Sequence, residues 1–334
     1  MSEYKNILIY SEASKDTLSS EGKELLGGAR KLADSIGEQV LCLIAGKDAS
    51  SAAAQAIAYG ADTVLCVSDG GPDGNREDAL CQILEHVVKT YLPRVLLVSQ
   101  KNVDVATRLG FKLDTGVCTD CVNVEMNAET KQITQTRSVY GGAARGVFTT
   151  RNAPQISCVR AKALSPLEYD GSRQGTIEPV QVPIDPGQFR TRTVSEVKEE
   201  GTAVKVENAS IIVCGGRGLG GPEPFNTVLK NLADALGGVV GSSRPPADNG
   251  WVSKALHIGL TGKIVAPSLY VAIAVSGASQ HMAGCSGSKT IVAINNDREA
   301  AIFRECDYGV VGPYEEVVPA LTKKLIELKN QKTA

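Results

Sequence analysis

The sequence predicts an α/β protein of two domains, each built on a parallel sheet that helices cover. The chain has 334 residues, which is too long for one hydrophobic core of ordinary size. Short apolar runs of strand length alternate with amphipathic segments of helix length, the pattern of parallel strands joined by helices. The alternation is interrupted by a polar stretch at about residues 183–208 and then resumes, so we expect a linker there.

The first domain is placed at residues 1–185. Its predicted strands are NILIY at 6–10, VLCLIAG at 40–46, TVLCVSD at 63–69 and RVLLVS at 94–99, and its predicted helices are 25–36, 52–59 and 78–91. After Asp114 the sequence changes to alternating polar and apolar residues that are rich in Thr and Val. This pattern favours antiparallel strands over residues 121–140.

The second domain is placed at residues 209–334, after a linker at 186–208. Its predicted strands are 210–214, 237–243, 269–275, 289–295 and 307–312, and its predicted helices are 225–236 and 317–328. The return of the strand and helix alternation predicts a second parallel, doubly wound sheet.

Composition excludes several classes of function. A net charge of −2 and a pI of about 6.0 leave no basic face for nucleic acid. No apolar run approaches the ~18 residues that a membrane span needs, so we expect no membrane insertion. MSEYK passes into a strand without a signal or arginine-rich presequence, which predicts a cytoplasmic protein.

The nine cysteines are an odd number and lie among aliphatic residues, which is typical of buried free thiols. Cys118 and Cys121 form a CxxC, but a second pair or a histidine at ligand spacing is missing. We therefore predict no metal site.

The loop GGRGLGG follows the first strand of the second domain. Gly216, Gly218 and Gly221 satisfy G-x-G-x-x-G, in which glycines let the backbone approach a phosphate at a helix N-terminus. A dinucleotide site also needs an acidic residue ~20 positions later, and here the next strand ends at Arg244 instead. Three interpretations remain open: a 2′-phosphate site, a different nucleotide fold, or a structural turn.

Further loops follow the other strands of this domain, and in an open parallel sheet such loops meet at one edge, where ligands bind. The candidate binding residues are Arg217, Ser243, Arg244, Ile258, Gly259, Leu260, Thr261, Ser276, Gly277, Ala278, Ser279, Gln280, His281 and Asn295. A lone histidine is more often structural. The convergence of these loops favours a ligand role for His281, as a proton donor beside a helix N-terminus.

In their order along the chain, the segments GGRG, SSR, TGKIVAP, LYVA, SGASQH, SKTIVAIN and DYG resemble the α subunit of electron transfer flavoprotein. The resemblance is dense from Ser210 to Leu325 and looser before it, where TG at 115–116 and YGG at 140–142 are compatible. It implies an N-terminal parallel-sheet domain like that of nucleotide hydrolases, which contacts a β subunit. It also implies a doubly wound, Rossmann-like C-terminal domain that binds FAD.

The resemblance also implies a role for each candidate residue. Arg217 and Asn295 would contact the phosphate and ribose, Arg244 the isoalloxazine ring together with Ser243, and Thr261 the flavin N5. Residues 276–281 would wrap the cofactor. His281 near the flavin C2 carbonyl would hold charge that appears only on reduction. Leu260 and Pro313 depart from the family pattern.

As a member of this family the chain would carry electrons as a heterodimer with a β subunit, between flavin dehydrogenases such as acyl-CoA dehydrogenase and an acceptor. A bifurcating mode would also involve NADH oxidation and ferredoxin, and the missing mitochondrial presequence favours it. The alternative from another class is an NAD(P)-dependent Rossmann dehydrogenase that uses GGRGLGG. A third, non-enzymatic interpretation makes the glycines structural.

Overall fold

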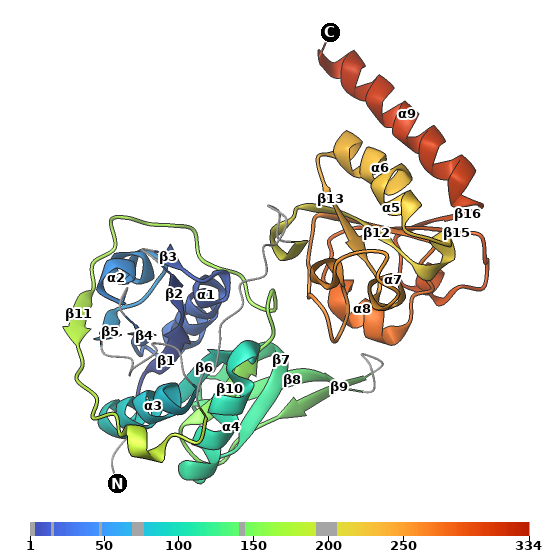
Figure 1. Ribbon diagram of the computed structural model, residues 1–334. Coiled ribbons are helices and arrows are strands. Elements are labelled where there is room, and N and C mark those ends of the chain that lie inside the picture. The colour runs from blue at the N-terminus through green and yellow to red at the C-terminus, as the bar shows by residue number, and fades with distance from the viewer. Residues whose placement is uncertain are drawn as a thin grey trace. The chain divides into compact units, whose positions relative to one another are not determined.

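The computed structural model describes residues 4–14, 17–46, 49–68, 77–139, 144–191 and 206–333. The chain divides into two compact units, residues 1–197 and 198–334 (Figure 1). Most of the predicted linker, and YGG at 140–142, lie outside the described residues. The predicted boundaries at 185 and 209 stay predictions.

The N-terminal unit contains a nine-stranded sheet in the order β11-β5-β4-β1-β6-β10-β7-β8-β9. The strands are β1 (Ile7–Ser11), β4 (Val40–Ala45), β5 (Thr63–Val67), β6 (Val95–Ser99), β7 (Val117–Asn127), β8 (Gln132–Val139), β9 (Ala144–Phe148), β10 (Gln155–Val159) and β11 (Thr176–Pro179). The pairs are parallel from β11 to β7, and β7-β8-β9 is antiparallel. Both parts of the prediction are confirmed. A two-stranded ribbon, β2 (Ala13–Ser14) with β3 (Thr17–Leu18), lies beside the sheet.

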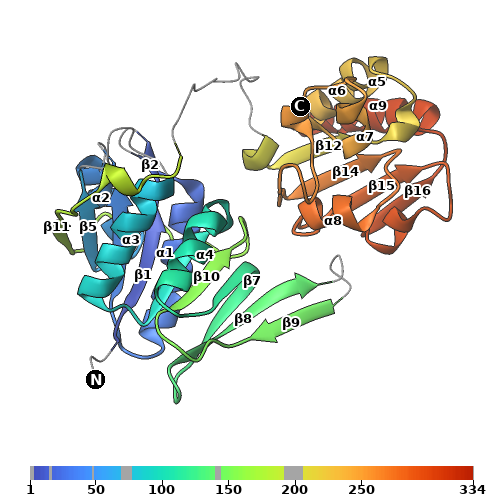
Figure 2. The same ribbon diagram turned by 60° about the horizontal axis from the view of Figure 1, so that its bottom comes forward.

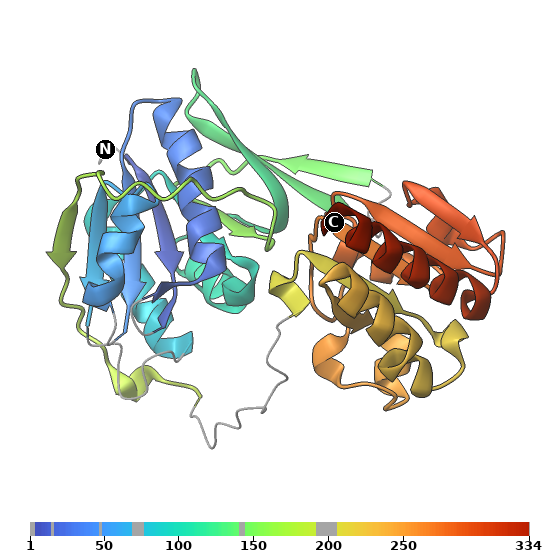
Figure 3. The same ribbon diagram turned by 90° about the horizontal axis from the view of Figure 1, so that it is seen from above.

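Helices cover both faces of this sheet (Figure 3). They are α1 (Ser20–Asp34), α2 (Ala49–Ala58), α3 (Glu77–Tyr91) and α4 (Val103–Lys112). One core cluster joins the sheet to α1 and α2, and the other joins it to α3 and α4. Before residue 192 the chain is tied to α3, because the Asp78 carboxylate accepts hydrogen bonds from the backbone of Arg190 and Thr191 at 2.8 and 3.0 Å.

The C-terminal unit contains a five-stranded, fully parallel sheet in the order β13-β12-β14-β15-β16. The strands are β12 (Ile211–Gly215), β13 (Val239–Ser242), β14 (Leu269–Ile273), β15 (Ile291–Asn295) and β16 (Tyr308–Val311). Taken along the chain this order is 2-1-3-4-5, and it differs from the 3-2-1-4-5-6 order of the dinucleotide-binding Rossmann fold. The predicted two-domain α/β fold class is confirmed.

The helices of this unit are α5 (Glu223–Asn226), α6 (Val228–Leu236), α7 (Arg244–Asp248), α8 (Ser279–Cys285) and α9 (Tyr314–Thr333). Figure 2 shows α5, α6 and α9 on one face of the sheet and α8 on the other, in agreement with two core clusters. The predicted single helix over 225–236 is wrong. Thr227, with φ −118° and ψ −85°, separates α5 from α6.

All nine cysteines are free, and all are buried except the half-buried Cys306. Cys118 and Cys121 lie on β7, inside the N-terminal core. Within the described ranges, no group of three or more His, Cys, Asp and Glu side chains is placed to hold a metal ion. Among the same residues, no helix is both long and apolar enough to cross a membrane.

Candidate functional site

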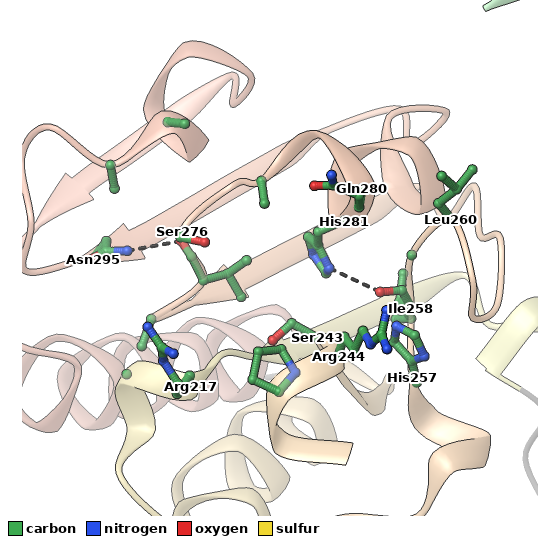
Figure 4. Close-up of a pocket in the computed structure, with 18 of the residues that line it drawn as sticks. Arg217, Ser243, Arg244, His257, Ile258, Leu260, Ser276, Gln280, His281 and Asn295 are labelled. Carbon is green, nitrogen blue, oxygen red and sulfur yellow. Dashed lines mark hydrogen bonds between the residues drawn. The ribbon is translucent and has the colours of Figure 1, made fainter. Parts of the chain in front are cut away.

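A cavity of about 900 Å³ opens at the carboxyl edge of the C-terminal sheet (Figure 4). The strand order reverses between β12 and β14, and ligands of doubly wound folds bind at such a reversal. All the predicted site residues line the cavity except Gly277 and Ser279. Loops after β12, β13, β14 and β15 therefore meet at one place, as the sequence predicted.

The glycine-rich turn after β12 presents Arg217 to the cavity but uses its first glycine for packing. A Cβ on Gly216 would lie 2.0 Å from the carbonyl oxygen of Ala274, at the end of β14. Gly220 adopts the left-handed conformation, and α5 begins only at Glu223. Gly216 therefore allows two strand ends to come together, and the prediction that the glycines of this turn let the backbone approach a phosphate stays a prediction.

Ser243 and Arg244 lie at the start of α7, directly after β13. The Ser243 N–H donates to Gly215 O at 2.9 Å, which fixes this strand end beside β12. Arg244 donates through Nε to Asp248 Oδ2 at 3.0 Å, one helical turn along. Figure 4 shows the guanidinium of Arg244 beside the imidazole of His257 at the cavity wall. Burial and the charge of Arg244 lower the pKa of His257, while the charge of Asp248 raises it.

Residues 258–261 form one wall of the cavity and rest on α8. The Leu260 N–H donates to Gln280 O at 2.7 Å, and a Cβ on Gly284 would lie 2.4 Å from the Gly259 nitrogen. Gly259, at φ +153°, is in the region that favours glycine. This close approach leaves Leu260 and Thr261 exposed at the cavity.

His281 is 7% exposed, and both of its ring nitrogens are bonded inside the protein. Nδ1 lies 3.1 Å from the carbonyl oxygen of Ile258, and Nε2 lies 3.0 Å from the hydroxyl of Tyr270. Burial lowers the pKa of His281 to about 4, so the ring is neutral at pH 7. A carbonyl only accepts hydrogen bonds, so the single N–H is on Nδ1 and is donated to Ile258. The predicted role of His281 as a donor to the ligand conflicts with these contacts.

Asn295 is also bonded internally. Its amide Nδ2 donates to Val275 O at 2.9 Å, and its Oδ1 accepts from the Asp297 N–H at 3.0 Å. The side chain therefore ties the end of β15 to the end of β14, and it lines the cavity from that position.

Gly277 lets the loop after β14 turn and pass close to the backbone of Ile302. Its φ is +79°, and a Cβ there would lie 2.3 Å from the Ile302 nitrogen. Ser279 begins α8 and directs its hydroxyl toward the Gln280 side chain at 3.4 Å.

Several residues that line the cavity are not among the predicted site residues. His257 precedes the predicted residue Ile258, and Asp297 and Glu299 follow the same strand end as Asn295. Their position directly beside predicted residues was the available signal. Gly218, named in the glycine motif, also lines the cavity, and the remaining missed residues are Pro245, Ala274, Val275, Ala300 and Ala301.

Two family models match the chain. Residues 7–185 match the electron transfer flavoprotein domain, and residues 205–286 match the electron transfer flavoprotein FAD-binding domain. The electron transfer flavoprotein subunit alpha of Thermoanaerobacterium thermosaccharolyticum is 38% identical over 98% of this chain and 100% of that protein. The subunit of the same name from Megasphaera elsdenii is 38% identical over 98% of both chains. Protein FixB of Clostridium saccharobutylicum is 32% identical, again over 98% of both.

These matches cover nearly the whole chain, and they confirm the resemblance found in the sequence. The chain therefore belongs to the electron transfer flavoprotein α-subunit family, and its C-terminal unit carries that family's FAD-binding domain.

Proposed function

We propose that this protein takes electrons from flavin dehydrogenases, with acyl-CoA dehydrogenase as the expected type, and passes them to a further acceptor. It does so as a heterodimer with an electron transfer flavoprotein β subunit, in the cytoplasm. Membership of the α-subunit family supports the electron-transfer role. The observation that carries the proposal is the cavity at the strand-order reversal, lined by loops from four strands.

The residues of the cavity fit FAD. The volume of the cavity, about 900 Å³, is toward the upper end of the ~300–1,000 Å³ range of ligand pockets, as an extended dinucleotide requires. Arg217 and Arg244 supply two guanidinium groups, which suit phosphate and planar rings. Asp297 and Glu299 add carboxylates, which accept hydrogen bonds from hydroxyl groups.

We assign the residues as follows. Arg217 holds the pyrophosphate, Arg244 lies against the flavin ring beside Ser243, and Thr261 donates to the ring from the tip of its loop. Within 276–281, the residues that line the cavity enclose the cofactor, namely Ser276, Ala278, Gln280 and His281. Bound there, FAD would supply one- and two-electron redox chemistry. The chain's own part is to bind the ring, orient it and place positive charge near it.

The first test is the nucleotide content of the chain purified with its β subunit, measured by acid extraction and chromatography. One FAD and one AMP per heterodimer would establish a single-flavin carrier. Two FAD would establish the bifurcating mode, in which NADH and ferredoxin take part. No FAD after reconstitution with excess cofactor would refute the proposal.

A pair of matched variants tests the site itself. Arg244→Gln should weaken FAD binding about tenfold, because a guanidinium against a desolvated aromatic ring contributes up to about 2 kcal/mol. Arg298→Gln removes the same charge from an exposed position that does not line the cavity, and FAD affinity should be unchanged. Equal losses in both variants would mean that overall charge, and not the site, binds FAD.

The alternative of an NAD(P)-dependent dehydrogenase is not proposed. Its main support was the glycine motif, and Gly216 is used to pack two strand ends together. Residues 205–286 match an FAD-binding domain instead.

A further inference from the structure

Tyr270 is the largest fully buried side chain of the C-terminal unit, and it does not line the cavity. It lies on β14, where its neighbours in sequence are aliphatic. Its hydroxyl reaches His281 Nε2 at 3.0 Å, and the thiols of Cys214 and Cys285 lie beside the same oxygen. A buried hydroxyl needs hydrogen-bond partners, and the partner here is a residue of the cavity.

The directions of these hydrogen bonds are fixed by chemistry. Ile258 offers a carbonyl, so His281 Nδ1 must carry the proton that joins them. In the neutral ring Nε2 then has only a lone pair, and the Tyr270 O–H must donate to it. The chain of bonds therefore runs from Tyr270 through His281 to the backbone of Ile258.

The end of this chain of bonds is the cavity wall at residues 258–261. Two other links hold the wall to α8, namely the backbone bond from Leu260 to Gln280 and the close approach of Gly259 to Gly284. The link through His281 differs from these because a side chain makes it. It therefore depends on the orientation of a ring, and the ring depends on Tyr270.

We propose that Tyr270 is a positioning residue of the cofactor pocket: its buried hydroxyl holds His281 in the tautomer and orientation that bind Ile258, and thereby fixes the wall that carries Thr261. The binding part of this inference rests on the proposed function, in which the cavity receives FAD. Tyr270 itself touches no ligand and acts through His281.

Losing the Tyr270 hydroxyl should loosen the wall and leave Nε2 as a buried acceptor without a donor. A cofactor then binds only the fraction of molecules in which the wall is in place, which weakens its apparent affinity by that fraction. We expect FAD to bind about tenfold more weakly to Tyr270→Phe, because one buried hydrogen-bond acceptor is left without its donor. Tyr308→Phe is the matched control, because Tyr308 is 68% exposed on β16 of the same unit.

The test begins with the full chain, free of cofactor and labelled with ¹⁵N-histidine. The chain has three histidines, so NMR gives few signals to assign. We expect His281 to be neutral with its proton on Nδ1 at pH 7, and its Nε2 signal to move in Tyr270→Phe but not in Tyr308→Phe. A wild-type His281 that is protonated on Nε2 overturns the inference, whether or not the variant folds.

The second arm is a double-mutant cycle on FAD affinity with His281→Gln. If Tyr270 acts through His281, the Tyr270→Phe loss should shrink to less than twofold in the His281→Gln background, because coupled residues are not additive. A tenfold loss that persists there would mean that Tyr270 only supports the core. If the wild-type chain takes up no FAD, the proposed function fails, while the NMR arm still decides the bond between Tyr270 and His281.

Discussion

The carboxyl edges of the two parallel sheets differ greatly in openness. At the C-terminal sheet the strand ends enclose about 900 Å³, whereas the cavity at the ends of β1 and β6 in the N-terminal sheet has about 10 Å³. The smaller space is about that of a single water molecule. Two sheets of the same doubly wound type therefore differ: the edge is open in the C-terminal unit and closed at the described ends of β1 and β6 in the N-terminal unit.

The contacts after the first strand of each sheet can be compared directly. In the N-terminal unit the first turn of α1 lies against the end of β1, because Gly22 packs on Ser11, where a Cβ would lie 1.9 Å from the hydroxyl oxygen. An ion pair from Lys101 to Glu21 then joins the β6 loop to the same helix. In the C-terminal unit a 3₁₀ turn and the short α5 precede α6, and Leu229 of α6 packs against Gly215 at the end of β12. The two edges thus differ in openness although both sheets are doubly wound, so fold class alone does not determine whether such an edge is open.

The largest effect is expected from adding a side chain to Gly277, a glycine of the open edge that combines a positive φ with a close backbone neighbour. Gly277→Ala forces a residue with Cβ to φ +79° and against the Ile302 nitrogen, so we expect a loss of about 4 kcal/mol in unfolding free energy. Urea unfolding followed by the fluorescence of Trp251, the only tryptophan of the chain, reports on this unit.

Gly22→Ala is the matched change in the closed edge. Its nearest neighbours are side-chain atoms of Ser11, and alanine favours the helix, so we expect a net loss of only about 1 kcal/mol. Equal losses of unfolding free energy at the two glycines would contradict the view that a backbone contact restricts Gly277 whereas only a movable side chain restricts Gly22.

The next effect is a pH dependence of the C-terminal unit. Burial lowers the pKa of His281 to about 4, against about 6.5 in an unfolded chain. Between these values the unfolded chain binds a proton that the native ring does not, so stability falls as the pH falls from 6.5 to 4. The full loss is roughly 3 kcal/mol, and above pH 6.5 the group costs nothing.

Urea unfolding of the wild type and of His281→Gln at pH 7 and pH 4.5 isolates this contribution, since other groups titrate alike in both. The wild type should lose roughly 2–3 kcal/mol more than the variant between the two pH values. A parallel decline in both proteins would mean that His281 is not held neutral in the native state.

The smallest effect is expected at the ion pair of the closed edge. Lys101→Ala removes an exposed partner of Glu21, and such pairs contribute about 0–1 kcal/mol. We expect no binding of AMP to the variant in equilibrium dialysis of the chain alone, because the packing of Gly22 on Ser11 remains. Uptake of AMP would show that the ion pair, and not the helix, closes this edge.

The sequence predicted the sheets well, because a parallel strand buried on both faces is a nearly continuous apolar run, as in VLCLIA at β4. It predicted the loops of the cavity because these follow such strands. It did not show that Thr227 would divide a helix, since local angles are set by packing. The part played by Tyr270 was also hidden, because an aromatic residue in an apolar run resembles any core residue until the fold places His281 beside it.

The buried cysteines allow the rate of local unfolding to be measured separately in each unit. Six buried thiols lie in the N-terminal unit and two, Cys214 and Cys285, in the C-terminal unit. A thiol reagent in water reaches such a sulfur only when the surrounding structure opens, so the rate of labelling measures how often it opens. Cofactor bound in the C-terminal unit should slow the labelling of Cys285 on α8, while the six N-terminal thiols keep their rates.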